Sequence, residues 1–233
     1  GGDFDTSRTA TGSSKYCWTI FSELTSFLVK AMIDFVVRCE DQKRRTAVFN
    51  SVNAYIDLFN DQSRYTLLIA LITHCPYPHV SAVFIDLYRR LLLQVTADSP
   101  FMKHLVDNIK SWLTARDLMT GRDVLSAALS LLRMALLNRH VSHCAALHEH
   151  HAALSASVKQ LDEQLVLEIR REISSSDWES QRETAALMTR QGLSNMSPRE
   201  IDVAQQQHIV QLQMIHSLVT RVFELLNEVR DEL

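Results

Sequence analysis

SPREIDVAQQQHIVQLQMIHSLVTRVFELLNEVRDEL, residues 197–233, predicts one long closing helix. Ser197 and Glu200 have the spacing of a capping box, and Pro198 stands at the first helical position, where its missing N–H costs nothing. After this start, residues of one helical face recur every three or four positions: His208, Leu212, Ile215, Val219, Val222, Leu226 and Val229. Further apolar residues widen that face: Ile209, Met214, Leu218, Phe223 and Leu225. We therefore expect a helix of about 50 Å that other helices contact from more than one side.

The composition favours helices throughout the chain. The 233 residues are 46% apolar, which is enough for one large domain or two small ones without a metal or a disulfide. Only five glycines and four prolines occur, which is few for hairpins or phosphate-binding loops. Helix is therefore the expected structure in every ordered part of the chain.

Apolar periodicity and turn signals divide the remaining sequence into shorter helices. The signals that separate them are Asn60–Ser63, Cys75–Pro78, Asp98–Pro100, Thr120–Asp123 and Ser174–Asp177. They predict helices over residues 20–40, 41–59, 65–72, 79–95, 100–113, 124–137, 141–174 and 176–187, followed by the closing helix. Short connections and antiparallel pairs of about 35–45 residues favour an all-α, HEAT/armadillo-like helical repeat stack. A closed helical bundle is the alternative architecture.

The first 14 residues are small, polar and aperiodic, so we expect residues 1–14 to be a disordered tail or a cloning remnant. Residues 15–233 are then expected to form a single α-helical repeat domain. Because the chain opens with Gly1-Gly2 rather than methionine, we interpret it as a piece of a longer protein.

Charge and cysteine content narrow the class of partner and the compartment. The net charge of −3 and pI near 6.4 give no electrostatic reason to bind nucleic acid or an anionic membrane. No apolar run of about 18 residues is free of charge, since Glu23, Lys30 and Asp34 interrupt the longest one, so no membrane span is expected.

Four separated cysteines without a CxxC pair suit buried thiols in a reducing compartment: Cys17, Cys39, Cys75 and Cys144. We expect a cytoplasmic protein, with the nucleus as a second location.

No motif of enzyme chemistry is present, so we expect no catalytic residues and no cofactor. The chain lacks GxSxG, P-loop and GxGxxG patterns. The strongest candidate for chemistry is RHVSHCAALHEHH, whose potential zinc ligands are His140, His143, Cys144, His148, His150 and His151. This segment lacks HExxH spacing and a second cysteine pair, so solvated histidines at a helix start are the preferred interpretation and no metal site is predicted. His208 is likewise expected to be a hydrogen-bonded core or interface residue.

Two stretches resemble the C-terminal half of the glomulin family, which includes a plant lateral-root-formation homologue. KRRTAVFNSVNAYIDLFNDQSRYTLLIAL, residues 43–71, resembles the family's basic helix start, short Asp/Gln turn and Arg-Tyr-Thr-Leu restart. NMSPREID and TRVFELLNEV, within residues 195–229, resemble its turn and closing helix, and LSLLRMALLN, residues 129–138, resembles a core helix. The order agrees over nearly all of residues 15–233, while the histidine-rich segment and residues 177–192 depart from the family pattern.

This resemblance implies a non-enzymatic regulator of cullin-RING ubiquitin ligases. Glomulin-like proteins are helical-repeat proteins that bind the RING-box subunit through their C-terminal repeats and cover the surface where the ubiquitin-conjugating enzyme docks. The chain would thus be a monomer that meets a cullin through the RING-box subunit. Arginine and tyrosine are favoured at interfaces, so we expect the partner to bind residues of these types that are exposed in the matching stretches: Arg44, Arg45, Arg64, Tyr65, Arg133 and Arg221.

Two alternatives remain open at this point. The same helical periodicity suits a general scaffold that binds another protein or a peptide. Each of the six candidate residues could instead be solvated or could connect neighbouring helices. The basic cluster of Lys43, Arg44 and Arg45 is also typical of a solvent-exposed helix end.

Overall fold

The computed structural model describes residues 29, 31–114, 118–138, 147, 149–190 and 198–231. Within these residues every regular element is an α-helix, so the predicted all-α class is confirmed. The chain divides into two compact units, Gly1–Cys75 and Pro76–Leu233. The division falls inside Cys75–Pro78, where the prolines were expected to end a helix.

In the first unit, α2 (Gln42–Asp57) and α3 (Asp61–His74) pack together, each with a side chain that caps its start. Asp41 accepts from the Lys43 amide at 2.8 Å, and Asn60 accepts from the Ser63 amide at 2.9 Å. The predicted turn over Asn60–Ser63 is wrong for Asp61–Ser63, which are helical; only Asn60 precedes the helix, as its cap. Asp61 lies in the first helical turn, where the helix dipole favours a negative charge. The buried apolar residues of the described part of this unit are Val29, Ile33, Val52, Ile56, Leu68, Leu71 and Ile72.

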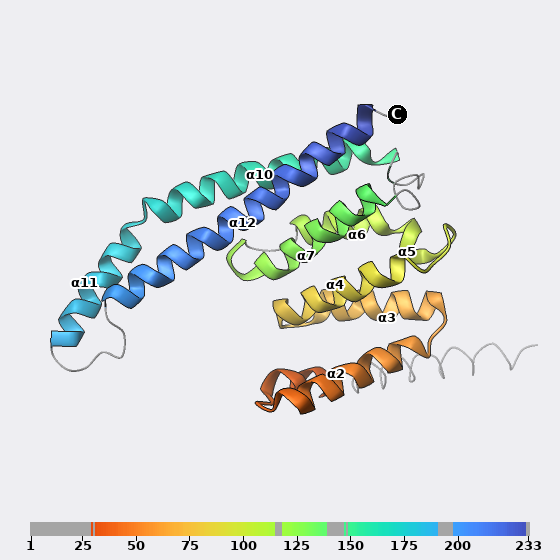
Figure 1. Cartoon of the computed structure of the whole chain (residues 1–233), viewed down its shortest axis with the longest axis horizontal. Coiled ribbons are helices and arrows are strands. Elements are labelled where there is room, and N and C mark those ends of the chain that lie inside the picture. Colours follow the sequence, from red (N-terminus) through yellow and green to blue (C-terminus); the bar gives the residue numbers. More distant parts are fainter. Residues whose placement is uncertain are drawn as a thin grey trace, which may run out of the picture. The chain divides into compact units, whose positions relative to one another are not determined.

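The second unit contains α4 (Pro78–Leu92), α5 (Pro100–Lys103), α6 (Leu105–Thr114), α7 (Leu118–Leu137), α10 (His151–Ile173), α11 (Ser176–Arg190) and α12 (Pro198–Asp231). α7 packs between α4 and α12, so these three helices form one layer (Figure 1). α6 and α10 contact each other and form a second layer. α6 also packs against α7, and α10 packs against α12. Two layers of consecutive, paired helices are the arrangement of a helical-repeat stack, as predicted.

Tyr88 is fully buried and connects α4, α5 and α6. Its ring contacts the rings of Phe101 and Trp112, with centroids 5.1 and 5.5 Å away. Its hydroxyl donates to the Phe101 carbonyl at 2.5 Å and accepts from the Asn108 amide at 3.3 Å. In a continuous helix, the Phe101 carbonyl would accept a backbone hydrogen bond, and the Tyr88 hydroxyl competes for this carbonyl. The single helix expected over 100–113 is instead interrupted at His104.

α7 begins earlier than predicted, because Thr120–Asp123 is helical rather than a turn. Glycine costs about 1 kcal/mol relative to alanine in a helix interior, but tertiary packing overrides such local preferences. Here Gly121 is buried, and the Arg122 guanidinium donates to the Gln211 side chain of α12, which holds this turn against its neighbour.

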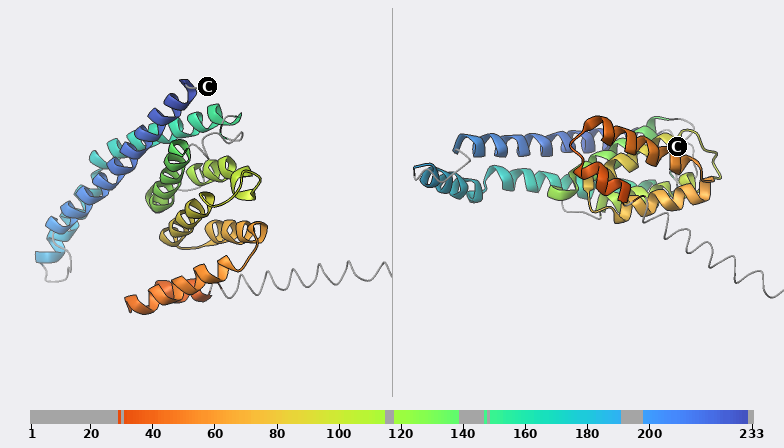
Figure 2. Two further views of the ribbon diagram at one scale, coloured as in Figure 1. Left: turned by 45° about the vertical axis from the view of Figure 1, so that its right-hand side comes forward. Right: turned by 90° about the horizontal axis from the view of Figure 1, so that it is seen from below.

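The predicted closing helix is confirmed as α12, which has 34 residues and runs beside α10 and α11 (Figure 2). A polar network joins the three helices where α10 ends. Trp178 Nε1 donates to the buried Glu172 carboxylate at 2.9 Å, and Gln205 donates to the Glu172 carbonyl at 3.0 Å. Arg182 donates to Gln205 at 2.8 Å and forms an ion pair with Asp202.

The helix predicted over 141–174 is observed from His151 to Ile173, and residues 139–146 and 148 lie outside the described residues. Ser197, the expected cap of α12, also lies outside them. α4 starts at Pro78 and ends at Leu92, three residues before the predicted end.

By length and composition alone, Arg199–Val229 of α12 could cross a membrane. This is weak support for a span, because the core helix of a soluble protein passes the same test. The buried residues of α12 face other helices, and α7, α10 and α11 all pack against it.

We expect Tyr88→Phe to lower the free energy of unfolding by about 1–3 kcal/mol, since it removes two hydrogen bonds from a buried site without changing the ring. Urea unfolding followed by circular dichroism measures the change. Leu93→Ala serves as the control, because Leu93 is 48% exposed nearby and its loss should cost under about 0.5 kcal/mol. Equal unfolding of wild type and Tyr88→Phe would contradict this account of the core.

Candidate protein-binding surface

Arg44 and Arg45 lie in the first turn of α2 and are both exposed. The Arg44 guanidinium lies 3.5 Å from the Asp41 carboxylate, a solvent-exposed pair that contributes little to stability. Both side chains are therefore accessible to a partner.

Arg64 has a different environment from the other candidates. Its Nη2 donates to the carbonyls of Asp57 and Phe59, both at 3.0 Å, at the end of α2. Its side chain is only 19% exposed, and Asp61 lies 4.0 Å away. The last carbonyls of a helix lack backbone hydrogen-bond donors, and Arg64 supplies donors to two carbonyls at the end of α2. Arg64 therefore connects α3 to α2. Tyr65 beside it is half-buried.

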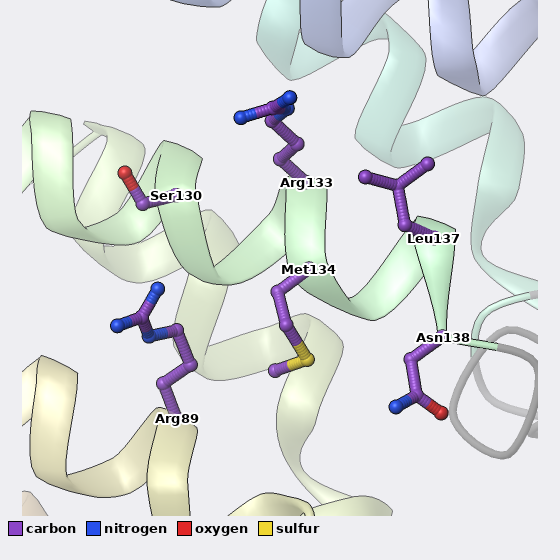
Figure 3. Close-up of a pocket in the computed structure, with 6 residues that line it drawn as sticks. All are labelled: Arg89, Ser130, Arg133, Met134, Leu137 and Asn138. Carbon is purple, nitrogen blue, oxygen red and sulfur yellow. The ribbon is translucent and has the colours of Figure 1, made fainter.

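Arg133 is exposed on α7 and lines an open groove of about 430 Å³ between α4 and α7 (Figure 3). Arg89 enters the groove from α4. The other lining residues are Ser130, Arg133, Met134 and Leu137 of α7 and Asn138, which directly follows α7. Arg133 makes no ion pair with any residue that the structure describes. We call these six residues the α4–α7 groove.

Arg221 is exposed on α12 but carries its own counter-charges. Its Nη1 lies 2.8 Å from a Glu224 carboxylate oxygen and 3.9 Å from a Glu228 oxygen. The hydrogen bond to Glu224, with the two negative charges, raises the pKa of Arg221 above its ordinary value. The residue stays charged, and its charge is largely balanced within α12.

The six expected residues thus fall into two sets. Arg44, Arg45, Arg64 and Tyr65 belong to the first unit, while Arg133 and Arg221 belong to the second, on helices that pack side by side.

Sequence reasoning missed an apolar stripe on α12 formed by Val203, Val210 and Met214, which are 50%, 44% and 68% exposed. Their spacing of seven and four residues places them on one helical face, distinct from the buried face that includes Leu212 and Ile215. Apolar periodicity placed Met214 in the packing surface of this helix, where it is in fact 68% exposed, and it singled out neither Val203 nor Val210. Arg89 was missed because it joins the α7 residues of the groove only when α4 packs on α7.

The histidine-rich segment is only partly described. His140, His143, Cys144 and His148 lie outside the described residues, as does Cys17. His151 Nε2 lies 2.8 Å from the Leu226 carbonyl and so ties α10 to α12. In the described part of the chain, no three histidine, cysteine, aspartate or glutamate side chains are placed to hold a metal ion.

The chain matches the sequence model of a known protein family. The sequence model of a family described as the uncharacterised protein family YAP/Alf4/glomulin matches residues 18–218. This match covers most of both units. No curated protein matches the chain.

Among the candidate arginines, only Arg64 should matter for stability. We expect Arg64→Ala to lower the free energy of unfolding by about 1–2 kcal/mol, because two helix-end carbonyls lose a charged donor. Arg45→Ala removes an exposed side chain on the preceding helix and should change it by under about 0.5 kcal/mol. Chemical denaturation of both variants tests this, and a larger effect at Arg45 than at Arg64 would refute the assignment.

Proposed function

Because the chain belongs to the YAP/Alf4/glomulin family, we propose that it binds the RING-box subunit of cullin-RING ubiquitin ligases and masks the surface for the ubiquitin-conjugating enzyme. Family membership indicates a regulatory, protein-binding role. The family match over residues 18–218 is the observation that carries the proposal.

The described structure is consistent with a binding protein that works without catalysis. A family fold built from helices suits a non-catalytic scaffold. We propose that the chain acts as a monomer in the cytoplasm, and also in the nucleus, wherever these ligases operate.

The proposed mechanism is competition for one surface. A protein–protein interface of ordinary size covers about 800 Å² on each partner, so a RING-box subunit covered at its enzyme-binding patch cannot hold the conjugating enzyme as well. Helices packed in a stack present their side chains on a preformed surface, which lowers the ordering cost of binding. No chemical step on the part of this chain is needed.

Two features of the second unit would supply the contacts. Arg133 is exposed without a counter-charge among the described residues, and arginine is enriched among residues that dominate binding energy. The stripe of Val203, Val210 and Met214 offers apolar area on the neighbouring helix. Arg221 should contribute less, because a partner would have to compete with Glu224 and Glu228 for its guanidinium.

Reconstituted ubiquitin transfer tests the proposal. Adding the purified chain to a RING-box–cullin complex should slow transfer, and a large excess of conjugating enzyme should restore the rate, because the two compete. Pull-down with the same complex should recover the chain. Undiminished transfer together with no capture would rule the proposal out. Capture with undiminished transfer would favour the alternative, a general scaffold.

A variant on the apolar stripe tests the surface. We expect Met214→Asp to weaken inhibition about tenfold or more, since it puts a charge into an apolar contact. Lys159→Ala, at an exposed position of α10, is the control and should inhibit as wild type does. If Met214→Asp inhibits fully while the wild-type chain is active, α12 is not part of the interface.

A further inference from the structure

We propose that the α4–α7 groove binds a short acidic segment of a protein partner. The carboxylates of this segment would contact Arg89 and Arg133, and an apolar side chain beside them would pack on Met134 and Leu137.

The shape of the groove suits a segment that crosses it. Its volume of about 430 Å³ is near the lower end of the roughly 300–1,000 Å³ range of ligand sites, and it is open to solvent. Leu137 is 58% exposed and Met134 is half-buried, so both can gain apolar contact when covered. An open groove of this size favours one or two side chains of an extended peptide over an enclosed small molecule.

The charge of the groove is positive. Arg89 pairs with Asp86 at 2.5 Å, but Arg90 shares that carboxylate at 3.7 Å, so two guanidinium groups face one counter-charge. Arg133 adds a second positive charge, and none of the six lining residues is acidic. Asp123, the exposed acidic residue of α7, precedes Ser130 by seven residues, about 10 Å along the helix.

The polar groups of the groove match carboxylates. A guanidinium presents planar, paired donors that fit both oxygens of a carboxylate. Ser130 lies on α7 with Arg133, while Arg89 comes from α4 (Figure 3), and Ser130 adds a hydroxyl that can donate.

A nucleic acid is the less suitable ligand. Its affinity depends on several cations that follow the phosphate backbone, whereas this groove has two, on a chain with a net charge of −3. Met134 and Leu137 give a backbone phosphate nothing to contact, but they suit an apolar residue next to an aspartate or glutamate.

This inference depends on the groove and not on the identity of the partner in the proposed function. The acidic segment could belong to the RING-box subunit, to a cullin or to another protein. The peptide-binding assay described next contains no ligase component. Absence of peptide binding would therefore overturn the groove proposal alone, and undiminished ubiquitin transfer would overturn the proposed function alone.

The probe is a fluorescein-labelled peptide of about twelve residues that alternates glutamate with leucine and serine. Fluorescence polarisation with the full chain should show saturable binding that weakens as salt is raised. A matched peptide with glutamine for glutamate should bind at least about tenfold more weakly. A labelled oligothymidine of similar length should bind more weakly than the acidic peptide.

Variants locate the binding in the groove. Arg133→Gln should weaken peptide binding up to about fivefold, the upper end for one exposed charge contact, and Arg133→Lys should retain part of the affinity. Arg89→Gln should weaken binding less, because Asp86 already pairs with Arg89. Lys159→Gln is the matched control, because it removes the same charge from an exposed position of α10 that does not line the groove, so affinity should be unchanged. Circular dichroism confirms that each variant is folded. Equal binding of the glutamine peptide or the oligothymidine, or full binding by folded Arg133→Gln, overturns the proposal.

Discussion

The burial of α7 is the constraint on which the second unit depends. Eight apolar residues between Val124 and Leu136 are buried around this helix, so neighbours must cover it from several sides, and α4, α6 and α12 do so. A narrow strip that includes Arg133 and Leu137 remains exposed. The groove therefore lies where it does because it is what the packing of α7 leaves uncovered.

The helices were largely predictable from sequence, because apolar spacing and caps such as Asp41 and Asn60 are local signals. The errors have tertiary causes. Gly121 was taken for a turn, yet burial and the Arg122–Gln211 contact keep it helical. The interruption at His104 depends on the Tyr88 hydroxyl, which reaches Phe101 from another helix. No window of a dozen residues contains either interaction.

Residue type alone does not tell which arginines are available to a partner, because arginine serves several purposes in this chain. The neutralisation of Arg221 was readable, since Glu224 and Glu228 follow it at helical spacing. The role of Arg64 was not, because its acceptors are backbone carbonyls whose position depends on the turn between α2 and α3. Arg133 was correctly named as exposed, but its companion Arg89 lies on another helix and needed the structure.

α12 also has a mechanical consequence. Its 34 residues form one continuous helix of about 51 Å. Near one end, Arg182 of α11 donates to Gln205 of this helix, and α10 and α7 also pack against it. A helix without a break transmits displacement along its axis, whereas a loop would absorb it. α12 therefore connects α11, which packs near its N-terminal end, to α7, which lines the groove, without an intervening loop.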